Sequence, residues 1–400
     1  MKKNILISTY DMEIGGIERS LINMLESLDY DKYNVDLFVF HHTGDFFPLI
    51  PPQVNVLPQL AAYTVFRKSI VQCLKEGHYA AAAIRVACKW LAGRTARKRR
   101  FKEGSGYVQM QLALKYCSYF LPRLPKSYDL VISYAWPHDI IAKKVSARRK
   151  VAWIHTDFSE LEIDSQLDLA VWSRFDSIAS VSEEVTRAFV KKYPSLNGHI
   201  MLFENITSPA FIKKMAEEEL PGADTYGNAF NIVSVGRLSY VKGFDMAVRA
   251  LKILHDKGLT HIKWRIVGYG GFEPELRALI AEHRLEDSFL LLGKKTNPYP
   301  YIKACDLYVQ PSRYEGKAVT VTEAKILGKP ILITRYPTSA SQVDDGIDGV
   351  TCGLSAEGIA EGIEMLYRNH EMRKALSDNI EGKDFGNAHE LRKLERLVEG

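Results

Sequence analysis

The sequence has few cysteines, and they form no pattern. Its five cysteines are scattered through 400 residues, and no two have Cys-x-x-Cys spacing. A disulfide framework or a structural zinc site would need paired or clustered thiols. We therefore expect a reducing compartment and no structural metal.

Long apolar runs are also missing. No stretch approaches the roughly 20 apolar residues that a membrane-spanning helix needs. The N-terminus passes from Met1-Lys2-Lys3 directly into a short apolar segment at 4–9, which is too short for the core of a signal peptide. These absences predict a cytoplasmic protein.

Positive charge is concentrated in one region. The net charge is +5, but residues 60–126 hold fourteen Lys and Arg against two acids, so the remainder carries a net negative charge. Such a region with interspersed aromatic and leucine side chains suits an anionic membrane surface or a lipid-linked phosphate. A solvated basic helix and a nucleic-acid surface are the alternatives. We favour the membrane or phosphate surface, without nucleic acid, and its densest run contains Arg94, Arg97, Lys98, Arg99 and Arg100.

The length and the hydrophobic pattern predict an α/β protein of two domains. Short apolar runs bounded by polar turns alternate with helical segments, which is typical of buried parallel strands. We predict strands at 5–8, 35–40, 129–133, 151–154, 175–182, 230–235, 264–267, 289–292, 307–310 and 330–333. Ser182 is placed to cap a helix over 183–192.

The domain boundary is expected where this alternation lapses. Residues 208–228 are polar and contain Pro209, Pro221 and Gly222, so we interpret them as a linker. The predicted domains are 1–207 and 229–382, each doubly wound. A helix within 383–400 is expected to pack back on the first domain.

Glycines and cations follow several of the predicted strands. Gly15 and Gly16 come after the first strand and before a helix, where free amide groups can meet an anion. Arg237 and Lys242 follow the strand 230–235, and two cations in such a loop can neutralise a diphosphate. Gly15-Gly16 can also be a plain turn, and the two cations can be ordinary surface residues.

A third glycine-rich loop argues against a dehydrogenase. Gly268-Tyr-Gly270-Gly271 imitates a dinucleotide fingerprint but lacks its last glycine. The next strand ends at Gly293-Lys294, where a dehydrogenase would carry an acid for the ribose. Hydride transfer is therefore disfavoured.

Two acids eight positions apart follow the strand 307–310. Glu315 lies in the loop, and Glu323 lies on a helix that should begin near 317–319. Glu323 would then lie four to six residues beyond the helix start, about 6–9 Å along the axis. This spacing would let Glu323 bind a ribose and Glu315 a sugar on either side of a diphosphate that meets the amide groups of the first turn.

In their order and spacing these motifs resemble the family 4 retaining glycosyltransferases. The resemblance rests on Gly15-Gly16-x-Glu18, Gly236-Arg237…Lys242-Gly243, Gly268-x-Gly270 and Glu315-x7-Glu323 and covers nearly the whole chain. It implies the GT-B fold, in which two Rossmann-like domains face each other across a cleft.

The resemblance also implies residue roles. Arg237, Lys242, Glu315 and His155 would be catalytic, with the two cations on the diphosphate of the departing nucleotide and Glu315 positioning the sugar. The first domain would bind the acceptor, with the basic run 94–100 facing it or the membrane, and Asp157 would be a weaker active-site candidate beside His155. The expected donor-binding residues are Gly16, Gly268, Lys294, Gly316, Lys317, Ala318, Val319 and Glu323.

The implied reaction is transfer of a hexose or N-acetylhexosamine from a nucleotide-diphosphate sugar, with UDP the commonest nucleotide in the family. The acceptor would be lipid-linked or a polysaccharide in cell-surface glycan synthesis, at the inner face of the cell membrane. No metal cofactor is expected, because the only Asp-x-Asp, Asp29-Tyr-Asp31, lies away from the strand ends that bind ligands. A nucleotide-sugar hydrolase or epimerase, a glycosyl phosphorylase and a non-catalytic sugar-nucleotide-binding subunit remain alternatives. Lys317-Ala318, where relatives often carry other residues, leaves the donor sugar open.

Overall fold

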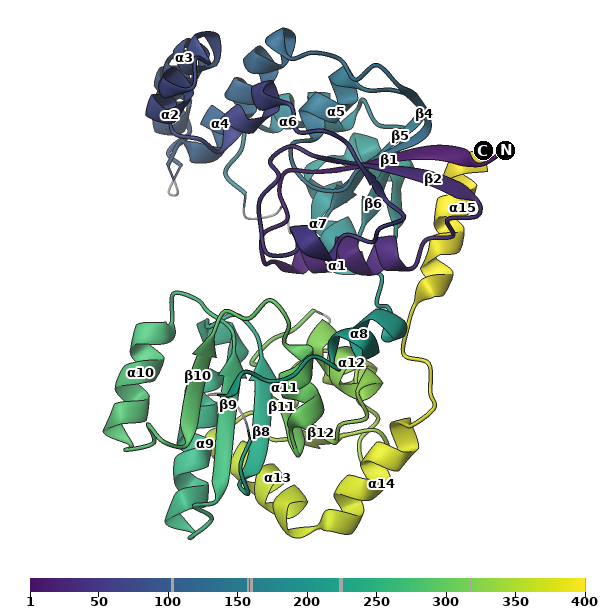
Figure 1. The fold of residues 1–400 in the computed structure, drawn as a ribbon. Helices are drawn as coiled ribbons and strands as arrows, with labels where there is room; N and C mark the ends of the chain where they lie inside the picture. Colours follow the sequence, from purple (N-terminus) through teal and green to yellow (C-terminus); the bar gives the residue numbers. More distant parts are fainter. Residues whose placement is uncertain (102–103, 157, 159–160, 223–225, 317, 400) are drawn as a thin grey trace. The chain divides into compact units, whose positions relative to one another are not determined.

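The protein is described by a computed structural model that covers residues 1–101, 104–156, 158, 161–222, 226–316 and 318–399. The chain divides into two compact units. Unit 1 comprises Met1–Thr207 and Asn387–Gly400, and unit 2 comprises Ser208–Gly386. Each unit is built on its own parallel sheet (Figure 1).

Unit 1 contains a seven-stranded sheet in the order β3-β2-β1-β4-β5-β6-β7. The chain winds from β1 toward β3 and then crosses to the other side of β1, so the switch point lies between β1 and β4. The strands are β1 (Lys3–Thr9), β2 (Tyr33–Val39), β3 (Asn55–Val56), β4 (Ser127–Ser133), β5 (Ser146–Ile154), β6 (Ser177–Ser180) and β7 (Ile200–Leu202). The helices are α1 (Gly16–Glu26), α2 (Ile70–Lys75), α3 (Tyr79–Arg99), α4 (Gly106–Cys117), α5 (His138–Lys144), α6 (Ser165–Trp172), α7 (Glu183–Lys192) and α15 (Arg392–Glu399).

Local sequence explains where these elements begin and end. The second halves of the central strands β4 and β5 are buried on both faces and mostly apolar, as expected for strands that are covered on each side. Helix α7 has the predicted bounds, and the Ser182 hydroxyl accepts a hydrogen bond from the amide of Val185, as an N-cap should.

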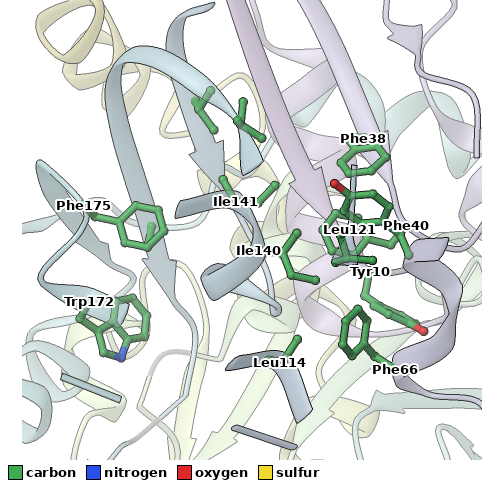
Figure 2. Close-up of a cluster of buried hydrophobic side chains, with 14 of the residues drawn as sticks. Tyr10, Phe38, Phe40, Phe66, Leu114, Leu121, Ile140, Ile141, Trp172 and Phe175 are labelled. Atoms are coloured by element: carbon green, nitrogen blue, oxygen red, sulfur yellow. The ribbon is translucent and has the colours of Figure 1, made fainter. Parts of the chain in front are cut away.

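Aromatic rings fill much of the core of unit 1. Figure 2 shows Tyr10, Phe38 and Phe40 gathered at the ends of β1 and β2. The ring centroids of Phe38 and Phe40 lie 4.7 Å apart, and those of Tyr10 and Phe40 lie 6.1 Å apart. Trp172 and Phe175 form a second group in the same cluster. The loop after β1 is thereby anchored in the core.

Helices α2, α3 and α4 pack against one another at one side of unit 1 (Figure 1). Many of the large apolar side chains that remain exposed in this protein lie on these helices and on the turn Ser118–Phe120 that follows α4. They include Val71, Leu74, Tyr79, Val86, Trp90, Leu91, Tyr107, Tyr116, Tyr119 and Phe120. The predicted basic stretch is therefore a helical subdomain with an apolar surface.

Unit 2 contains a six-stranded sheet in the order β10-β9-β8-β11-β12-β13. Its switch point lies between β8 and β11. The strands are β8 (Phe230–Val235), β9 (Ile262–Val267), β10 (Phe289–Gly293), β11 (Leu307–Gln310), β12 (Ile331–Thr334) and β13 (Val350–Cys352). The helices are α8 (Pro209–Met215), α9 (Phe244–Asp256), α10 (Glu273–Glu282), α11 (Tyr299–Ala304), α12 (Val319–Ile326), α13 (Ala356–Arg368) and α14 (His370–Ile380).

The structure corrects the expected linker at 208–228. This segment begins with helix α8, which Ser208 caps and which packs on α11 and α12 of unit 2. Phe211 and Ile212 are buried there. Their apolar contacts make this segment part of unit 2, although most of its residues are polar.

In unit 1, Lys32 on the loop before β2 pairs with Glu395 of α15.

Candidate functional site

The predicted donor residues of unit 2 follow the carboxyl ends of neighbouring strands. Strand β8 lies between β9 and β11 in the sheet, so the loops after these three strands meet at one edge. Arg237 and Lys242 follow β8, Gly268 follows β9, and Glu315 follows β11. The switch point between β8 and β11 is where doubly wound sheets bind ligands.

Lys242 and Glu315 meet across this switch point. The Lys242 Nζ atom lies 2.6 Å from Glu315 Oε1, although the two residues are 73 positions apart. The Lys242 side chain is 24% exposed and that of Glu315 only 9%. The sequence predicted that Lys242 binds the phosphates and that Glu315 binds the sugar. The structure shows that the two side chains are in direct contact.

Buried polar side chains hold Glu315 in place. Its Oε1 atom also accepts hydrogen bonds from Gln310 Nε2 at 3.0 Å and Ser312 Oγ at 2.6 Å. Gln310 Oε1 in turn accepts from the Tyr308 hydroxyl at 2.8 Å and Thr320 Oγ1 at 3.2 Å. Burial raises the pKa of Tyr308, so its hydroxyl stays protonated and donates. The carboxylate is thus oriented before any ligand arrives.

Arg237 leaves its charge available. Its side chain is exposed and makes no hydrogen bond or ion pair with any residue that the structure describes. Lys294 follows β10, with Nζ 5.6 Å from the centroid of the Tyr269 ring. Lys317, also predicted to bind the donor, lies outside the described residues.

Two glycines let the loops of this edge touch. A Cβ atom on Gly268 would lie 1.8 Å from the carbonyl oxygen of Gly236, so a side chain there would force the loops after β8 and β9 apart. Gly243 has φ +69°, and a Cβ atom on it would lie 1.9 Å from the carbonyl oxygen of Pro311. These contacts fix Arg237 and Lys242 relative to the loop of Glu315.

Helix α12 begins at Val319, within the expected interval. The first amide groups of a helix have no partner inside it and attract anions. The amide of Ala318, just before the helix, donates to Gln342 Oε1 at 2.9 Å. A Cβ atom on Gly316 would meet no heavy atom within 4 Å, so the chain passes through open space there.

Glu323 lies one turn into α12 and is buried. The Tyr299 hydroxyl donates to its Oε1 atom at 3.0 Å. Tyr299 comes from α11, so two helices fix the position of this carboxylate. Sequence spacing gave no signal for the role of Tyr299, because its contact with Glu323 joins two separate helices. Gln310 and Ser312 lie only five and three positions before Glu315, and their hydrogen bonds to it depend on the conformation of the loop.

In unit 1 the glycine motif opens helix α1. A Cβ atom on Gly15 would lie 2.3 Å from Glu18 Oε2, so the glycine leaves room for that carboxylate at the helix start. A Cβ atom on Gly16 would meet nothing within 4 Å. Burial raises the pKa of Glu18. The predicted anion site at this N-terminus therefore already has a carboxyl group beside it.

His155 follows β5, as predicted, and its ring contacts that of Tyr134. Its Nε2 atom lies 2.9 Å from the carbonyl oxygen of Tyr134, which can only accept, so Nε2 carries the proton. Burial lowers the pKa of His155 to about 4, which keeps the ring neutral near pH 7. Its buried Nδ1 atom has no hydrogen-bond partner among the described residues. Asp157 lies outside those residues.

His155 lines a cavity of about 760 Å³ within unit 1. This volume is within the usual range for small-molecule sites. Most of the wall is aromatic or aliphatic, and the acidic, basic and histidine side chains that line it are Arg67, Lys115, His138, Asp139, Lys143, His155, Asp168 and Arg174. Burial lowers the pKa of His138 to about 3, so its ring is neutral as well.

The basic run after Trp90 does not reach this cavity. Arg94 stacks over the Trp90 ring, 3.8 Å from its centroid. Arg99 pairs with Asp164 at 3.1 Å. Of the predicted acceptor or membrane residues Arg94, Arg97, Lys98, Arg99 and Arg100, none lines the cavity. The cavity instead takes its cations from α4, α5 and the loops after η2 and α6 (Ala61–Phe66 and Ser165–Trp172).

Residues 216–383 match the family model described as glycosyl transferases group 1. Most of unit 2 is thus similar to the glycosyl transferases group 1 family. This match covers the loops that carry Arg237, Lys242, Glu315 and Glu323. The sequence-based recognition of the family is thereby confirmed for this part of the chain.

Curated relatives and solved structures agree with this assignment. A Campylobacter jejuni N-acetylgalactosamine-N,N'-diacetylbacillosaminyl-diphospho-undecaprenol 4-alpha-N-acetylgalactosaminyltransferase is 30% identical over 37% of this chain and 40% of its own length. The Erwinia amylovora amylovoran biosynthesis glycosyltransferase AmsK is 29% identical over 36% of each chain. This chain therefore spans less than half the length of these two relatives.

Two solved structures cover the whole chain. Anabaena HepE, in a complex with UDP and glucose, has 17% identity and a TM-score of 0.62 over 100% of each chain. Staphylococcus aureus TarM has 13% identity and a TM-score of 0.64 over 100% of this chain and 99% of its own. At these identities the likeness concerns the fold, and it confirms the α/β GT-B architecture.

Two further findings concern the described residues alone. No group of three or more His, Cys, Asp or Glu side chains among them is arranged to hold a metal ion. Within the same ranges, no helix combines the length and the apolar character needed to cross a bilayer.

Proposed function

We propose that this chain is a retaining glycosyltransferase of family 4 that moves a hexose or N-acetylhexosamine from a UDP-sugar to a lipid-linked or polysaccharide acceptor. The observation that carries this proposal is the contact of Lys242 with Glu315 at the switch point of a glycosyl transferases group 1 domain. The UDP in the HepE complex supports the choice of nucleotide. The names of the relatives from C. jejuni and E. amylovora support an acceptor used in surface-glycan synthesis.

The donor diphosphate would lie against Arg237, Lys242 and the first turn of α12. Negative charge builds on the β-phosphate as the glycosidic bond breaks, and fixed cations with helix amide groups stabilise that charge. Among the described residues, Arg237 has no ion-pair partner that a ligand would have to displace. Lys242, held by Glu315, would approach the phosphate as a point charge.

Glu323 would hold the ribose hydroxyls, and Glu315 would orient the transferred sugar. Because Lys242, Gln310 and Ser312 all donate to Glu315 Oε1, the other oxygen is the one suited to a sugar hydroxyl. In unit 1, the lone pair on His155 Nδ1 can accept a hydrogen bond from the acceptor. Attack from the face of the departing phosphate, which takes the acceptor proton, would retain the anomeric configuration without a metal ion.

The experiment uses the purified chain with a panel of UDP-, GDP- and ADP-sugars, each with and without a glycan or lipid-linked acceptor. We expect release of UDP that depends on acceptor, and an anomeric proton in the product with the configuration of the donor, read by NMR. Equal UDP release without acceptor would refute transfer and indicate hydrolysis. An inverted anomeric centre would refute retention.

Peripheral attachment to the inner face of the cell membrane is part of the proposal. The exposed apolar residues of α2, α3 and α4, together with the surrounding Lys and Arg, support it. Vesicles of anionic lipid should bind the chain at low salt more strongly than neutral vesicles. Absence of binding at low salt would refute the membrane location.

A further inference from the structure

A groove lies between α3 and the C-terminal end of α4 with the turn that follows it. It has a volume of about 420 Å³. Ile84, Ala87, Cys88 and Leu91 of α3 form one wall, and Tyr116, Tyr119 and Phe120 form the other. Nearly all of the groove surface is apolar, so a bare oligosaccharide would lose hydrogen bonds to water without replacing them.

Helix α4 separates this groove from the large cavity of unit 1. Met110, Gln111, Leu114 and Lys115 face the cavity, and Tyr116, next in the chain, faces the groove. Tyr119 lines both spaces. A single ligand with a polar head and an apolar tail could therefore occupy both by passing Tyr119.

Lys115 stands at this boundary. Its ammonium lies 5.6 Å from the centroid of the Tyr116 ring and makes no hydrogen bond or ion pair within the described part of the chain. The other lysine of the cavity, Lys143, is instead paired with Asp139 at 2.9 Å. Arg67 is likewise paired, with Asp11.

More positive charge surrounds the exposed turn after α4. Tyr119 and Phe120 are each 71% exposed. Lys144 Nζ lies 3.5 Å from the carbonyl oxygen of Tyr119, and Lys143 Nζ lies 5.6 Å from the centroid of its ring. Burial and the nearby charges of Arg123 and Lys143 lower the pKa of Lys144. Aromatic side chains among cations are the composition of a membrane-interface contact.

We propose that the groove and the cavity form one binding site for a lipid-linked diphosphate acceptor. The hydrocarbon chain lies in the groove against Leu91 and Phe120, Lys115 binds the phosphate, and the sugar enters the cavity. The inference rests on the proposed function in taking this ligand as the acceptor, and it chooses the lipid-linked class over a free polysaccharide. The apolar groove carries this choice.

Calorimetric titration of the full chain with farnesyl diphosphate, farnesol and inorganic diphosphate tests the proposal. Saturating UDP is present throughout, so that the donor site of unit 2 is closed to diphosphates. We expect farnesyl diphosphate to bind at least tenfold more tightly than either fragment, because only it combines a hydrocarbon chain for the groove with a phosphate for Lys115.

Variants separate the two halves of the site. Lys115→Gln should weaken farnesyl diphosphate about tenfold, the effect of losing one charge-assisted hydrogen bond, and leave farnesol unchanged. Leu91→Glu and Phe120→Ser should weaken both ligands. Lys89→Gln and Val86→Ser are the matched controls, since these exposed α3 residues line neither space, and they should change nothing.

The proposal is overturned if farnesyl diphosphate binds no better than inorganic diphosphate, or if Lys89→Gln weakens it as much as Lys115→Gln. UDP binding to every variant shows that the chain is folded and reports on the donor site separately. If the chain binds UDP but not farnesyl diphosphate, the result therefore counts only against the proposed lipid-linked acceptor. Absence of UDP binding in the unaltered chain would instead count against the proposed transferase.

Discussion

Replacing Lys242 by alanine separates its structural contribution from its proposed contact with the donor. Among the described residues, the change leaves the carboxylate of Glu315 with hydrogen bonds from Gln310 and Ser312. A fully buried pair costs about 3–5 kcal/mol to break. Here Lys242 is partly exposed and two donors remain, so we expect a loss of about 1–2 kcal/mol in the free energy of unfolding.

This loss in the free energy of unfolding can be measured as a lower melting temperature. Unit 2 has roughly 180 residues, and a domain of that size shifts by about 2–4 °C per kcal/mol. The ligand-free variant should thus melt about 2–8 °C lower. At 100 times its dissociation constant, UDP adds about 2.7 kcal/mol to the unaltered chain, or about 5–11 °C.

The rise in melting temperature that UDP causes is the decisive measurement. A charge-assisted hydrogen bond is worth about 1.5–3 kcal/mol, which is about 10- to 100-fold in affinity. At the upper end, the same UDP concentration equals the new dissociation constant and adds only about 0.4 kcal/mol, or about 1–2 °C. Lys242→Ala should therefore lose between about half and most of its UDP shift.

Lys252→Ala is the matched control. Lys252 forms an exposed ion pair with Asp256 on α9, away from the switch point, and such pairs contribute at most about 1 kcal/mol. Differential scanning fluorimetry with increasing UDP measures both variants. An undiminished UDP shift in Lys242→Ala, or an equal reduction in Lys252→Ala, would refute the reasoning.

Three further predictions follow from the same structure. Glu323→Ala should weaken UDP about tenfold in calorimetry through loss of the ribose contact, with Glu361→Ala on α13 as control; unchanged affinity would show the ribose assignment to be wrong. Because burial lowers the pKa of His138 to about 3 and of His155 to about 4, the unfolded chain binds more protons than the folded one below about pH 6.5. Stability should therefore be fully present above pH 6.5 and fall toward pH 4, as followed by urea midpoints, and the fall should be shallower in His138→Asn; a flat profile would contradict the burial argument. Excess EDTA should leave the initial transfer rate unchanged, and a loss restored by Mg²⁺ would reject the metal-free mechanism.

The sequence by itself determined the alternation of elements and the position of the motifs at strand ends. Strands β8 and β11 and helix α7 have the predicted bounds, because short apolar runs ended by polar turns, and a serine at an N-cap, are local signals. The family resemblance belongs to the same level, since it needs only the order and spacing of residues such as Gly236, Arg237 and Glu323.

Only the tertiary structure decided which of these residues meet. The contact of Lys242 with Glu315 depends on the crossover that places β11 beside β8, and no spacing within one segment encodes that crossover. Helix α8 shows the same limit, because burial against α11 and α12 outweighed a local composition typical of a linker. The cavity and groove of unit 1 likewise draw their walls from separate elements. Parallel strands need long connections, so the residues that share a site in such a fold lie far apart along the chain.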